Sequence, residues 1–380
     1  MEKENYEIWS EGVDVVEYPR TVLPKETDIL IIGGGMAGLT NAYLLSKIGK
    51  KILLLEKNML GMRVTGCTTG FLTSVIDTDP IRLIKKFGFE NARLILESHR
   101  VAIDEVEKII KEEKIECEFE RCTNYIYANS LREEKYLIIL TEGYKKLGIN
   151  TEYKKDDSII FAKFGYIEMP YHAKFHAIKY LHALAKIAVK NGVVIAENTE
   201  VLKLEDKIDY VDVEVKDVGI IKSGKVVSAT YTPFGKIDKL SHLANLYREY
   251  VVEYKVDSGA LIDGTYEDTL DPYNYFRIDK RNSFDRLMIG GADNLNIMNV
   301  NRDISFGLIR KYTEDLFNKI KDPVINFNGI ILEKDKIDKN KIDIAVEYLK
   351  NEGVVVFPTE TVYGIGANAF NESAVSKIFK

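Results

Sequence analysis

The order of apolar and polar positions predicts alternating strands and helices in the first half of the chain. Residues 28–32 and 51–56 form short apolar runs, and residues 36–48 between them have apolar positions at helical spacing. A strand, a helix and a strand in this order predict one βαβ unit. Helical spacing also predicts helices over 80–114, 132–148 and 172–191.

Beyond residue 210 the pattern becomes rich in short strands. Five runs alternate or cluster apolar residues at strand length: YVDVEV, KVVSAT, YVVEYKV, YNYFRI and RLMIGG. Such a block predicts an antiparallel sheet inserted into, or packed beside, a parallel-sheet domain. A helix is expected from about Asp303 to Ile320, and the proline and the Lys/Asp-rich run that follow predict a linker at 326–342.

Composition narrows the class of protein. The chain has 380 residues, of which 46% are hydrophobic, so it can form two or three domains with a substantial core. Its net charge of −6 comes from interspersed acids and lysines, which argues against nucleic acid or an anionic membrane as main partner. The N-terminal residues lack the order of a secretory signal. The apolar stretch 28–45 contains a glycine cluster, Thr40 and Asn41, which favour a buried strand, turn and helix over a membrane span.

The cysteine content predicts a reducing compartment. Cys67, Cys117 and Cys122 leave one thiol unpaired in any disulfide scheme, so we expect a cytoplasmic protein. The spacing of Cys117 and Cys122 is too wide for a zinc knuckle and no second pair follows, which favours ordinary semi-buried thiols and no metal site.

The glycines in IIGGGMAGL predict a dinucleotide site. Gly33, Gly35 and Gly38 stand in G-x-G-x-x-G register between the first predicted strand and its helix. In this pattern the glycines allow a tight turn, close approach of a pyrophosphate, and close packing of helix on strand. Glu56 ends the second strand, where an acid accepts from ribose hydroxyls and disfavours the 2′-phosphate of NADP. An incidental glycine turn is the alternative.

A resemblance adds what spacing cannot. The run from TDILIIGGGMAGL to GMRVTGCTTGFLTS resembles the D-amino-acid-oxidase-like superfamily of FAD-dependent oxidoreductases, and more narrowly its bacterial members that often carry a C-terminal Rieske domain. The resemblance continues through AKFHAIKYLHALAKIAVKNGVVIAENTEV and VVSATYTPF to RLMIGGADN, and fades near Phe317.

This resemblance implies FAD as cofactor and specific contacts for it. The segment that wraps the flavin in the family corresponds here to Thr65, Gly66, Thr68 and Thr69, and Val201 would lie against the adenine. For the threonines, a turn whose hydroxyls bond their own backbone remains open. No counterpart follows of the family's final strand and glycine-rich helix start, so we expect that flavin-binding part to be missing.

The implied chemistry is oxidation of the C–N bond of an amine or amino acid, with hydride transfer to the flavin. The cofactor supplies the difficult step, so no nucleophile–base pair is required and the catalytic residues stay unknown. Tyr273, Tyr275 and Arg277 are candidates for the substrate wall, because a cation and aromatic rings suit such a ligand, with packing as the favoured alternative. His172 and His176 would share a helix face, where a packing role is favoured over metal binding.

The last residues resemble a different enzyme. VVVFPTETVYGIGANAFNESAVSKIFK is similar to the start of the YrdC-like threonylcarbamoyl-AMP synthases, which use L-threonine, bicarbonate and ATP in a tRNA modification. The resemblance implies that Thr359, Thr361 and Tyr363 line a threonine and nucleotide pocket, whereas the residues alone fit a strand and glycine turn. A helix is expected before VVVFP and another from Asn371. We expect a fusion or a mis-joined boundary between two coding sequences.

Together these observations predict an α/β protein. The expected parts are an N-terminal extension (1–24), an oxidoreductase region with interleaved FAD-binding and antiparallel β-rich substrate subdomains (25–325), the linker (326–342), and an incomplete α/β segment (343–380). The predicted function is FAD-dependent oxidation of a small amine or amino acid, with an electron acceptor as second partner. The alternative is the synthase activity of the C-terminal segment.

Overall fold

The computed structural model describes residue 9 and residues 12–20, 22–231, 245–259, 261–270, 272–295, 302–317, 323–333, 355–358 and 363–366. For 245–246, 295 and the last three ranges only the backbone is described. These residues form two compact units that alternate along the chain. The small-sheet unit contains 9–66 and 177–246, and the large-sheet unit contains 67–176 and 247–331. Each is considered by itself.

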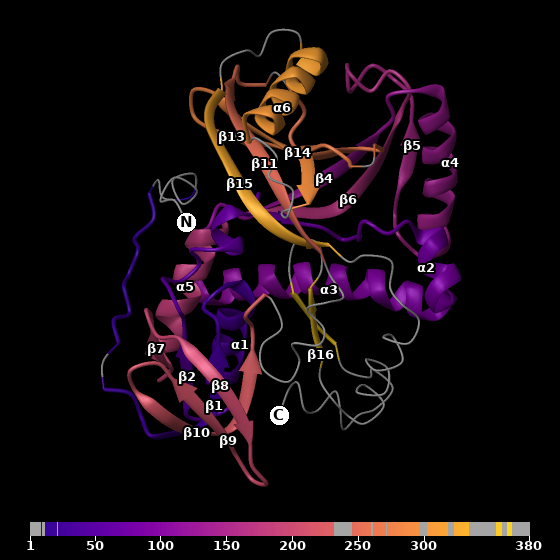
Figure 1. Ribbon diagram of the computed structural model, residues 1–380. Coiled ribbons are helices and arrows are strands. Elements are labelled where there is room, and N and C mark those ends of the chain that lie inside the picture. Colours follow the sequence, from indigo (N-terminus) through magenta and orange to yellow (C-terminus); the bar gives the residue numbers. More distant parts are fainter. Residues whose placement is uncertain are drawn as a thin grey trace. The chain divides into compact units, whose positions relative to one another are not determined.

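The small-sheet unit is built on six strands in the order β7-β2-β1-β10-β9-β8 (Figure 1). Neighbours β7, β2, β1 and β10 run parallel, whereas β9 and β8 add an antiparallel extension. Helix α1 packs against helix α5. The strands are β1 (Glu26–Ile32), β2 (Ile52–Leu55), β7 (Val194–Ala196), β8 (Val201–Asp206), β9 (Val211–Val215) and β10 (Gly219–Ser228). The helices are α1 (Met36–Ser46) and α5 (Ala177–Lys190). The 3-10 turn η2 (Val64–Cys67) lies where the chain passes from this unit to the other. The predicted βαβ unit is confirmed.

Burial explains why the first two strands read as continuous apolar runs. All four residues of β2 and the last four of β1 are buried. Strands of a parallel sheet that are covered on both faces are expected to look this way. Leu30, Leu53 and Leu55 join a core with residues of β8, β9 and β10. This rigid layer holds the turn between β1 and α1.

The large-sheet unit contains a sheet of nine described strands in the order β15-β11-β14-β13-β12-β4-β6-β3, with β5 paired to β6. Strand β12 is parallel to β4 and antiparallel to β13. The strands are β3 (Phe71–Leu72), β4 (Glu120–Tyr127), β5 (Glu152–Lys154), β6 (Tyr166–Lys174), β11 (Asn245–Val256), β12 (Thr265–Asp268), β13 (Tyr275–Lys280), β14 (Asp285–Leu295) and β15 (Pro323–Glu333). The helices are α2 (Pro80–Phe87), α3 (Phe89–Glu113), α4 (Leu131–Lys146) and α6 (Arg302–Phe317).

The two faces of this sheet differ in chemistry. One face is an aromatic core in which the rings of Tyr266 and Phe276 stack 4.5 Å apart, and Ile309 of α6 packs into it. Successive side chains of a strand point to opposite faces, so Arg277 and Asp279 of β13 share the other face. That second face carries buried charges where a core of apolar side chains is usual. We call it the polar face.

Three expectations about elements are corrected. The predicted helix 80–114 is two helices, because Gly88, with φ of 79°, interrupts it. The predicted helix 172–191 begins only at Ala177, and His172 lies in β6. The β-rich block is divided between the sheets, since β9 and β10 belong to the small sheet and β11, β13 and β14 to the large one.

The predicted linker at 326–342 is also corrected in part. Residues 323–333 form β15, which lies beside β11. A proline is acceptable as the first residue of a strand, so Pro323 opens β15 rather than ending the domain. Residues 334–342 lie outside the described part. Further on, the strand expected at VVVFP is present as β16 (Val355–Pro358), paired with β17 (Tyr363–Gly366), and the helices expected around this pair lie outside the described residues.

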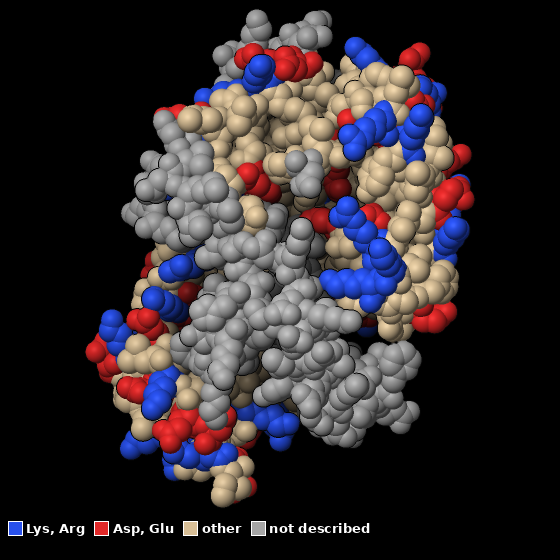
Figure 2. Space-filling view, turned by 45° about the vertical axis from the view of Figure 1, so that its right-hand side comes forward, with Lys and Arg blue, Asp and Glu red and all other residues tan. Residues whose placement is uncertain are grey.

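Two surface properties complete the description. None of the helices in the described ranges has the length and apolarity needed to cross a bilayer. On the face shown in Figure 2, basic and acidic residues are interspersed over the described surface. The predicted α/β fold, with a Rossmann-like sheet and a second β-rich sheet, is confirmed.

Candidate dinucleotide site

The turn after β1 can be made only with glycines. Gly33 has φ of +107°, and a Cβ placed there would lie 2.4 Å from the carbonyl oxygen of Ala229. A Cβ on Gly38 would lie 1.9 Å from the carbonyl oxygen of Gly33. Both obstacles are backbone atoms that cannot move aside cheaply. The first and third glycines of the motif therefore bring α1 close to the strand, as their spacing predicts.

The second motif glycine, Gly35, gives the start of α1 an N-cap residue without a side chain of its own to cap the helix. The first turn of the helix contains no acid. The first N–H groups of a helix lack partners within it and carry partial positive charge, which favours an anion. Thr65 Oγ1 accepts the Met36 N–H at 3.1 Å, and a Cβ on Gly35 would lie 3.2 Å from the same oxygen. The helix start, Gly35 and Thr65 thus lie together.

Glu56 follows β2 directly and faces the same turn. Its carboxylate accepts the N–H of Gly34 at 2.6 Å and the N–H of Asn58 at 2.7 Å. Gly34, the middle glycine of the run, has little room for a side chain, because a Cβ would lie 2.3 Å from Leu60 Cδ2 and 3.0 Å from Glu56 Cβ. Glu56 is therefore fixed at the end of β2, where its free acceptor capacity suits ribose hydroxyls. Sequence spacing identified Glu56 but missed Gly34.

A second acid supports this loop and was missed altogether. Glu197 follows β7, is buried, and accepts the N–H of Leu60 at 2.6 Å and the N–H of Tyr18 at 2.7 Å. The Glu197 N–H in turn donates to the carbonyl of Tyr18 at 2.8 Å. One buried carboxylate therefore ties the Glu56 loop to the N-terminal segment. Its position at the end of a short apolar run, VVIAE, was the available signal.

These residues fit a dinucleotide. A tight glycine turn, a helix start whose N-cap residue is a glycine, and an acid at the end of the next strand provide places for a pyrophosphate and a ribose. Val201 begins β8 and packs in the core beside Leu55, which is compatible with the place expected for it near the adenine. That contact remains a prediction.

The flavin-binding segment expected from Thr65 to Thr69 crosses from η2 toward β3. Gly66 is buried in the small-sheet unit, and its N–H donates to the carbonyl of Arg63. Thr68 Oγ1 accepts the N–H of Gly70 at 3.3 Å, which is the local turn considered as the alternative for this residue. The Thr69 side chain is buried. Their contact with a flavin remains a prediction.

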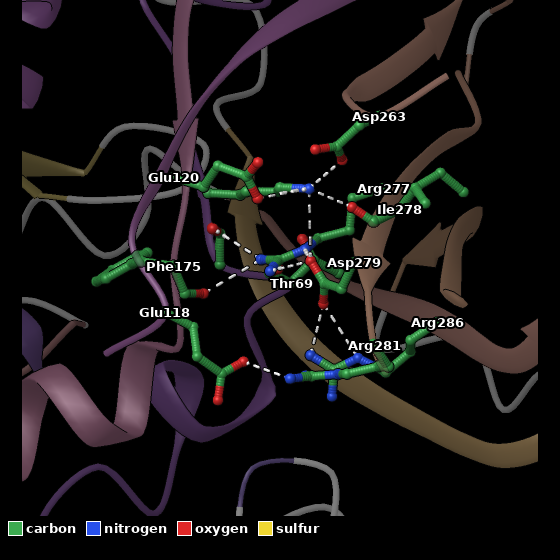
Figure 3. Close-up of polar contacts among 12 residues, drawn as sticks. Thr69, Glu118, Glu120, Phe175, Asp263, Arg277, Ile278, Asp279, Arg281 and Arg286 are labelled. Carbon is green, nitrogen blue, oxygen red and sulfur yellow. Dashed lines mark hydrogen bonds and ion pairs between the residues drawn. The ribbon is translucent and has the colours of Figure 1, made fainter. Parts of the chain in front are cut away.

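Arg277 lies inside the large-sheet unit and not on an open wall. Its side chain is 1% exposed, and its Nη1 donates to the carbonyls of Thr69, Gly70 and Phe175 (Figure 3). Its Nε and Nη2 donate to Asp279 Oδ1 at 2.9 and 2.5 Å. The guanidinium is therefore committed to internal partners, and the packing alternative holds for this residue. A substrate carboxylate would have to displace Asp279.

Asp279 links several charges on the polar face. Its second oxygen accepts from Arg286 Nε at 3.0 Å and Nη2 at 2.6 Å, and Lys174 Nζ lies 4.0 Å from the first. Lys174 is itself paired with Asp263. Burial alone would raise the pKa of Asp279, but the charges of Arg277, Arg286 and Lys174 hold that pKa well below its usual range. The carboxylate is therefore ionised.

The two tyrosine candidates lie near each other, with ring centroids 6.0 Å apart. Tyr275 is buried and its hydroxyl donates to Glu249, whereas the hydroxyl of half-buried Tyr273 lies 3.4 Å from Asp77. Burial, reinforced by nearby carboxylates, raises the pKa of both phenols, so both stay protonated. Their surroundings are acidic, a feature that the sequence did not reveal. Substrate contact remains a prediction for both.

Glu267 adds a titratable group to this face. It lies opposite Tyr275 in the β12–β13 pair and accepts from Asn124 Nδ2 at 3.1 Å. Burial raises the pKa of Glu267 to about 7, with a further rise from Asp268 and an opposing effect of the Asn124 hydrogen bond. Its side chain keeps partial exposure in the folded chain. The group therefore changes charge near neutral pH.

The histidine pair expected on one helix face is not formed. His172 is fully buried in β6, with Nδ1 3.3 Å from Ser74 Oγ, and burial lowers its pKa to about 3. His176 precedes α5, and its N–H donates to the carbonyl of Cys117. Residues 172–174 are the end of β6, and α5 begins only at Ala177, so the helical spacing was extended too far toward the N-terminus. Packing, the favoured interpretation, describes His172.

Of the three C-terminal candidates for threonine and nucleotide binding, only Tyr363 lies within the described residues. Thr359 and Thr361 lie outside the described residues. Tyr363 begins β17, where its backbone pairs with Pro358. The proposed threonine and nucleotide contacts are therefore untested.

Comparisons with known proteins agree with the two parts found in the sequence. Residues 28–340 match the DAO family model, described as FAD dependent oxidoreductase. Residues 347–380 match the Sua5/YciO/YrdC model, described as telomere recombination. A threonylcarbamoyl-AMP synthase of Pyrococcus abyssi is 49% identical to this chain over 51 residues, 13% of this chain and 15% of that protein.

Relatives and solved structures extend the first match. A Bacillus subtilis protein, "Putative Rieske 2Fe-2S iron-sulfur protein YhfW", is 32% identical over 249 residues, 65% of this chain and 48% of its own length. The chain spans about half the length of the curated relatives it matches. The crystal structure of glycine oxidase from Geobacillus kaustophilus has the same fold, with a TM-score of 0.67 and 15% identity over 93% of this chain and 92% of that one. With 313 of 380 residues inside the family model, counted from 28 to 340, the chain belongs to the DAO family of FAD-dependent oxidoreductases.

Proposed function

We propose that this chain binds FAD and oxidises the C–N bond of an amine or amino acid. The observation that carries the proposal is the turn of Gly33, Gly35 and Gly38 at the start of α1, which we call the glycine cradle. Glu56 is fixed beside it, inside a chain that matches an FAD-dependent family. The solved glycine oxidase and the amino acid oxidase NikD share the fold, which supports an amino substrate.

The chain's own residues would bind and orient the cofactor. The N–H groups at the start of α1 would hold the pyrophosphate, and Glu56 would accept from the adenosine ribose. Bound FAD would supply the oxidising chemistry by accepting a hydride from the carbon next to nitrogen. The acidic surroundings of Tyr275 favour a cationic amine group over a carboxylate at that place.

The test is substrate reduction of the bound flavin. The protein loaded with FAD is mixed without oxygen with a panel of primary amines, N-methylated amines and amino acids, and the visible flavin spectrum is followed. We expect at least one member of the panel to bleach the flavin, and air or an artificial acceptor to restore it. A flavin that dithionite reduces but no amine or amino acid reduces would contradict the proposed reaction.

A second candidate concerns the C-terminal segment alone. Its similarity to threonylcarbamoyl-AMP synthases supports a pocket for threonine and ATP, but the match covers 15% of the Pyrococcus abyssi protein. Saturable binding of ATP or threonine to the whole chain, lost in the double variant Thr359→Val with Thr361→Val, would favour this candidate. Binding that persists in the variant would assign the nucleotide to the glycine cradle.

We also infer a cytoplasmic location. Cys67, Cys117 and Cys122 are all buried and none forms a disulfide, as expected for a reducing compartment. Burial raises the pKa of the Cys67 and Cys122 thiols to about 11, so both are inert near neutral pH.

A further inference from the structure

Arg277 connects the polar face to the threonine segment by one edge of its guanidinium. Nη1 lies 2.6 Å from the Thr69 carbonyl oxygen, 3.0 Å from that of Gly70 and 3.2 Å from that of Phe175 (Figure 3). Arg277 and Thr69 are 208 positions apart in the chain. The contact therefore joins β13 to a segment that no local interaction would bring to it.

The other edge of the guanidinium is fixed by charge. Nε and Nη2 both donate to Asp279 Oδ1, and Asp279 is itself held by Arg286 from β14. A planar guanidinium fixed on two sides has one orientation, which a flexible lysine ammonium does not reproduce. Nη1 is thus presented to the three carbonyls as part of a buried, charge-balanced frame.

The threonine segment leads directly into a short strand. Thr69 and Gly70 lie between η2 and β3, a strand of two residues whose partners among the described residues are Ala173 and Lys174. Gly70 has φ of +70°, and its carbonyl also accepts the Phe175 N–H at 3.1 Å. Holding two successive carbonyls toward one donor fixes the peptide planes on both sides of Gly70. It therefore fixes the backbone that follows Thr69, including the Gly70 N–H that donates to Thr68 Oγ1 at 3.3 Å.

We propose that Arg277 is a positioning residue for the flavin segment: it holds the backbone at Thr69 and Gly70, and through the Gly70 N–H the Thr68 hydroxyl, instead of touching substrate. The proposal rests on the proposed function, because it takes Thr65 to Thr69 as the part of the chain that contacts the flavin. It replaces the substrate-wall role considered for Arg277. Its consequence is that Arg277 controls binding of the flavin portion of FAD but leaves binding of ADP to the glycine cradle unchanged.

The experiment compares FAD and ADP binding in matched variants of the full chain. Arg277→Lys keeps a positive charge beside Asp279 but loses the planar set of guanidinium donors. Arg277→Met removes both the charge and the donors. Arg281→Met is the control, because Arg281 pairs with Glu118 at a partly exposed site and contacts none of the three carbonyls. Dissociation constants for both ligands are measured by titration, and the visible-range circular dichroism of bound FAD is recorded.

We expect Arg277→Lys to bind FAD about tenfold or more weakly, since hydrogen bonds from a charged donor are lost. ADP affinity should stay within about twofold, the circular dichroism of bound flavin should change, and Arg281→Met should match the wild type on every measure. Arg277→Met should weaken FAD binding at least as much as Arg277→Lys.

Other outcomes overturn the proposal in distinguishable ways. Equal losses of FAD and ADP affinity would show that Arg277 only supports the fold. Unchanged FAD affinity and circular dichroism in Arg277→Lys would show that the flavin segment does not depend on the guanidinium hydrogen bonds. A wild-type chain that binds ADP but no FAD would overturn the proposed function itself, and with it this role for Arg277.

Discussion

The glycine turn of the small sheet and the polar face of the large sheet are built from opposite kinds of residue. In the small sheet, the turn before α1 depends on side chains that are absent, because a Cβ on Gly33 or Gly38 would meet backbone atoms. On the polar face, long charged side chains are buried and pair with one another, as Arg277 does with Asp279. The first arrangement brings α1 close to β1, and the second holds the backbone at Thr69 and Gly70 within its own unit.

The difference also separates local from long-range construction. The motif glycines and Glu56 lie within about thirty residues, as is usual for a βαβ unit. The polar face collects residues from β4, β6, β12, β13 and β14, and its ties reach to Thr69 and Phe175. Substitutions that change one residue of each arrangement therefore test whether the two differ in their effects on stability and on FAD binding.

The largest effect is expected for Asp279→Asn. This change leaves Arg277 and Arg286 buried without their shared counter-charge, which costs about 3–5 kcal/mol of unfolding free energy. Urea unfolding near neutral pH measures it, with Asp14→Asn as control, because that carboxylate forms only an exposed pair with Lys186. Equal stability of the two variants would show that the ion pairs of Asp279 with Arg277 and Arg286 do not stabilise the fold.

The same residue predicts the acid side of the stability curve. The pKa of Asp279 is lowered in the folded chain, so its stabilising contribution is present above the unfolded value of about 3.9 and disappears as pH falls below it. The Asp279→Asn variant should therefore lose less stability than the wild type between about pH 5 and about pH 3. Parallel curves for the two proteins would contradict this assignment.

A smaller effect is expected at the cradle, for Gly38→Ala. The new Cβ would meet the Gly33 carbonyl, and forcing helix and strand apart costs about 1–3 kcal/mol and about tenfold or more in FAD affinity. Gly307→Ala in α6 is the control, since a Cβ there meets no atom within 4 Å. That control should keep FAD affinity and gain up to about 1 kcal/mol from better helix propensity. Equal FAD affinity in both variants would remove Gly38 from the site.

Next in size is the effect of Glu56→Gln. The amide keeps the shape but loses the charge that accepts from Gly34, Asn58 and the proposed ribose, so FAD and ADP should both bind about tenfold more weakly. Glu200→Gln, which alters surface ion pairs with Lys57 and Lys216, should bind both ligands normally. A loss confined to FAD would place Glu56 away from the adenosine ribose.

The smallest effect is expected for Glu267→Gln, and it depends on pH. Burial raises the folded pKa of Glu267 to about 7, so the folded state prefers the protonated acid and the wild type loses stability as pH rises toward that value. The amide does not titrate. Thermal unfolding should therefore favour the variant more at about pH 8 than at about pH 5. A difference that does not depend on pH would show that Glu267 titrates normally.

What the sequence could predict follows the same division. Gly33, Gly38 and Glu56 were identified because one continuous stretch contains the whole pattern, and the structure places them as the spacing predicts. The role of Arg277 was not identified, because its partners at Thr69 and Phe175 are remote in sequence. One signal was available: Arg277 and Asp279 are two positions apart in a strand, which puts them on one face.

Errors in the elements have equally specific causes. His172 was assigned to a helix because the apolar spacing before Ala177 fits both periods over so short a stretch. The linker prediction took Pro323 as an end when it opens β15. Neither error touched the glycine cradle, whose elements are long enough for their period to be unambiguous.

The central claim is that the glycine cradle of this chain holds FAD, and a visible absorption spectrum tests it most directly. All 380 residues are purified without added cofactor, beside the Gly38→Ala variant, and the flavin is quantified after denaturation. We predict a flavin spectrum at near-stoichiometric occupancy in the wild type and a strongly reduced one in the variant. A colourless wild-type protein that also fails to take up added FAD would contradict the account.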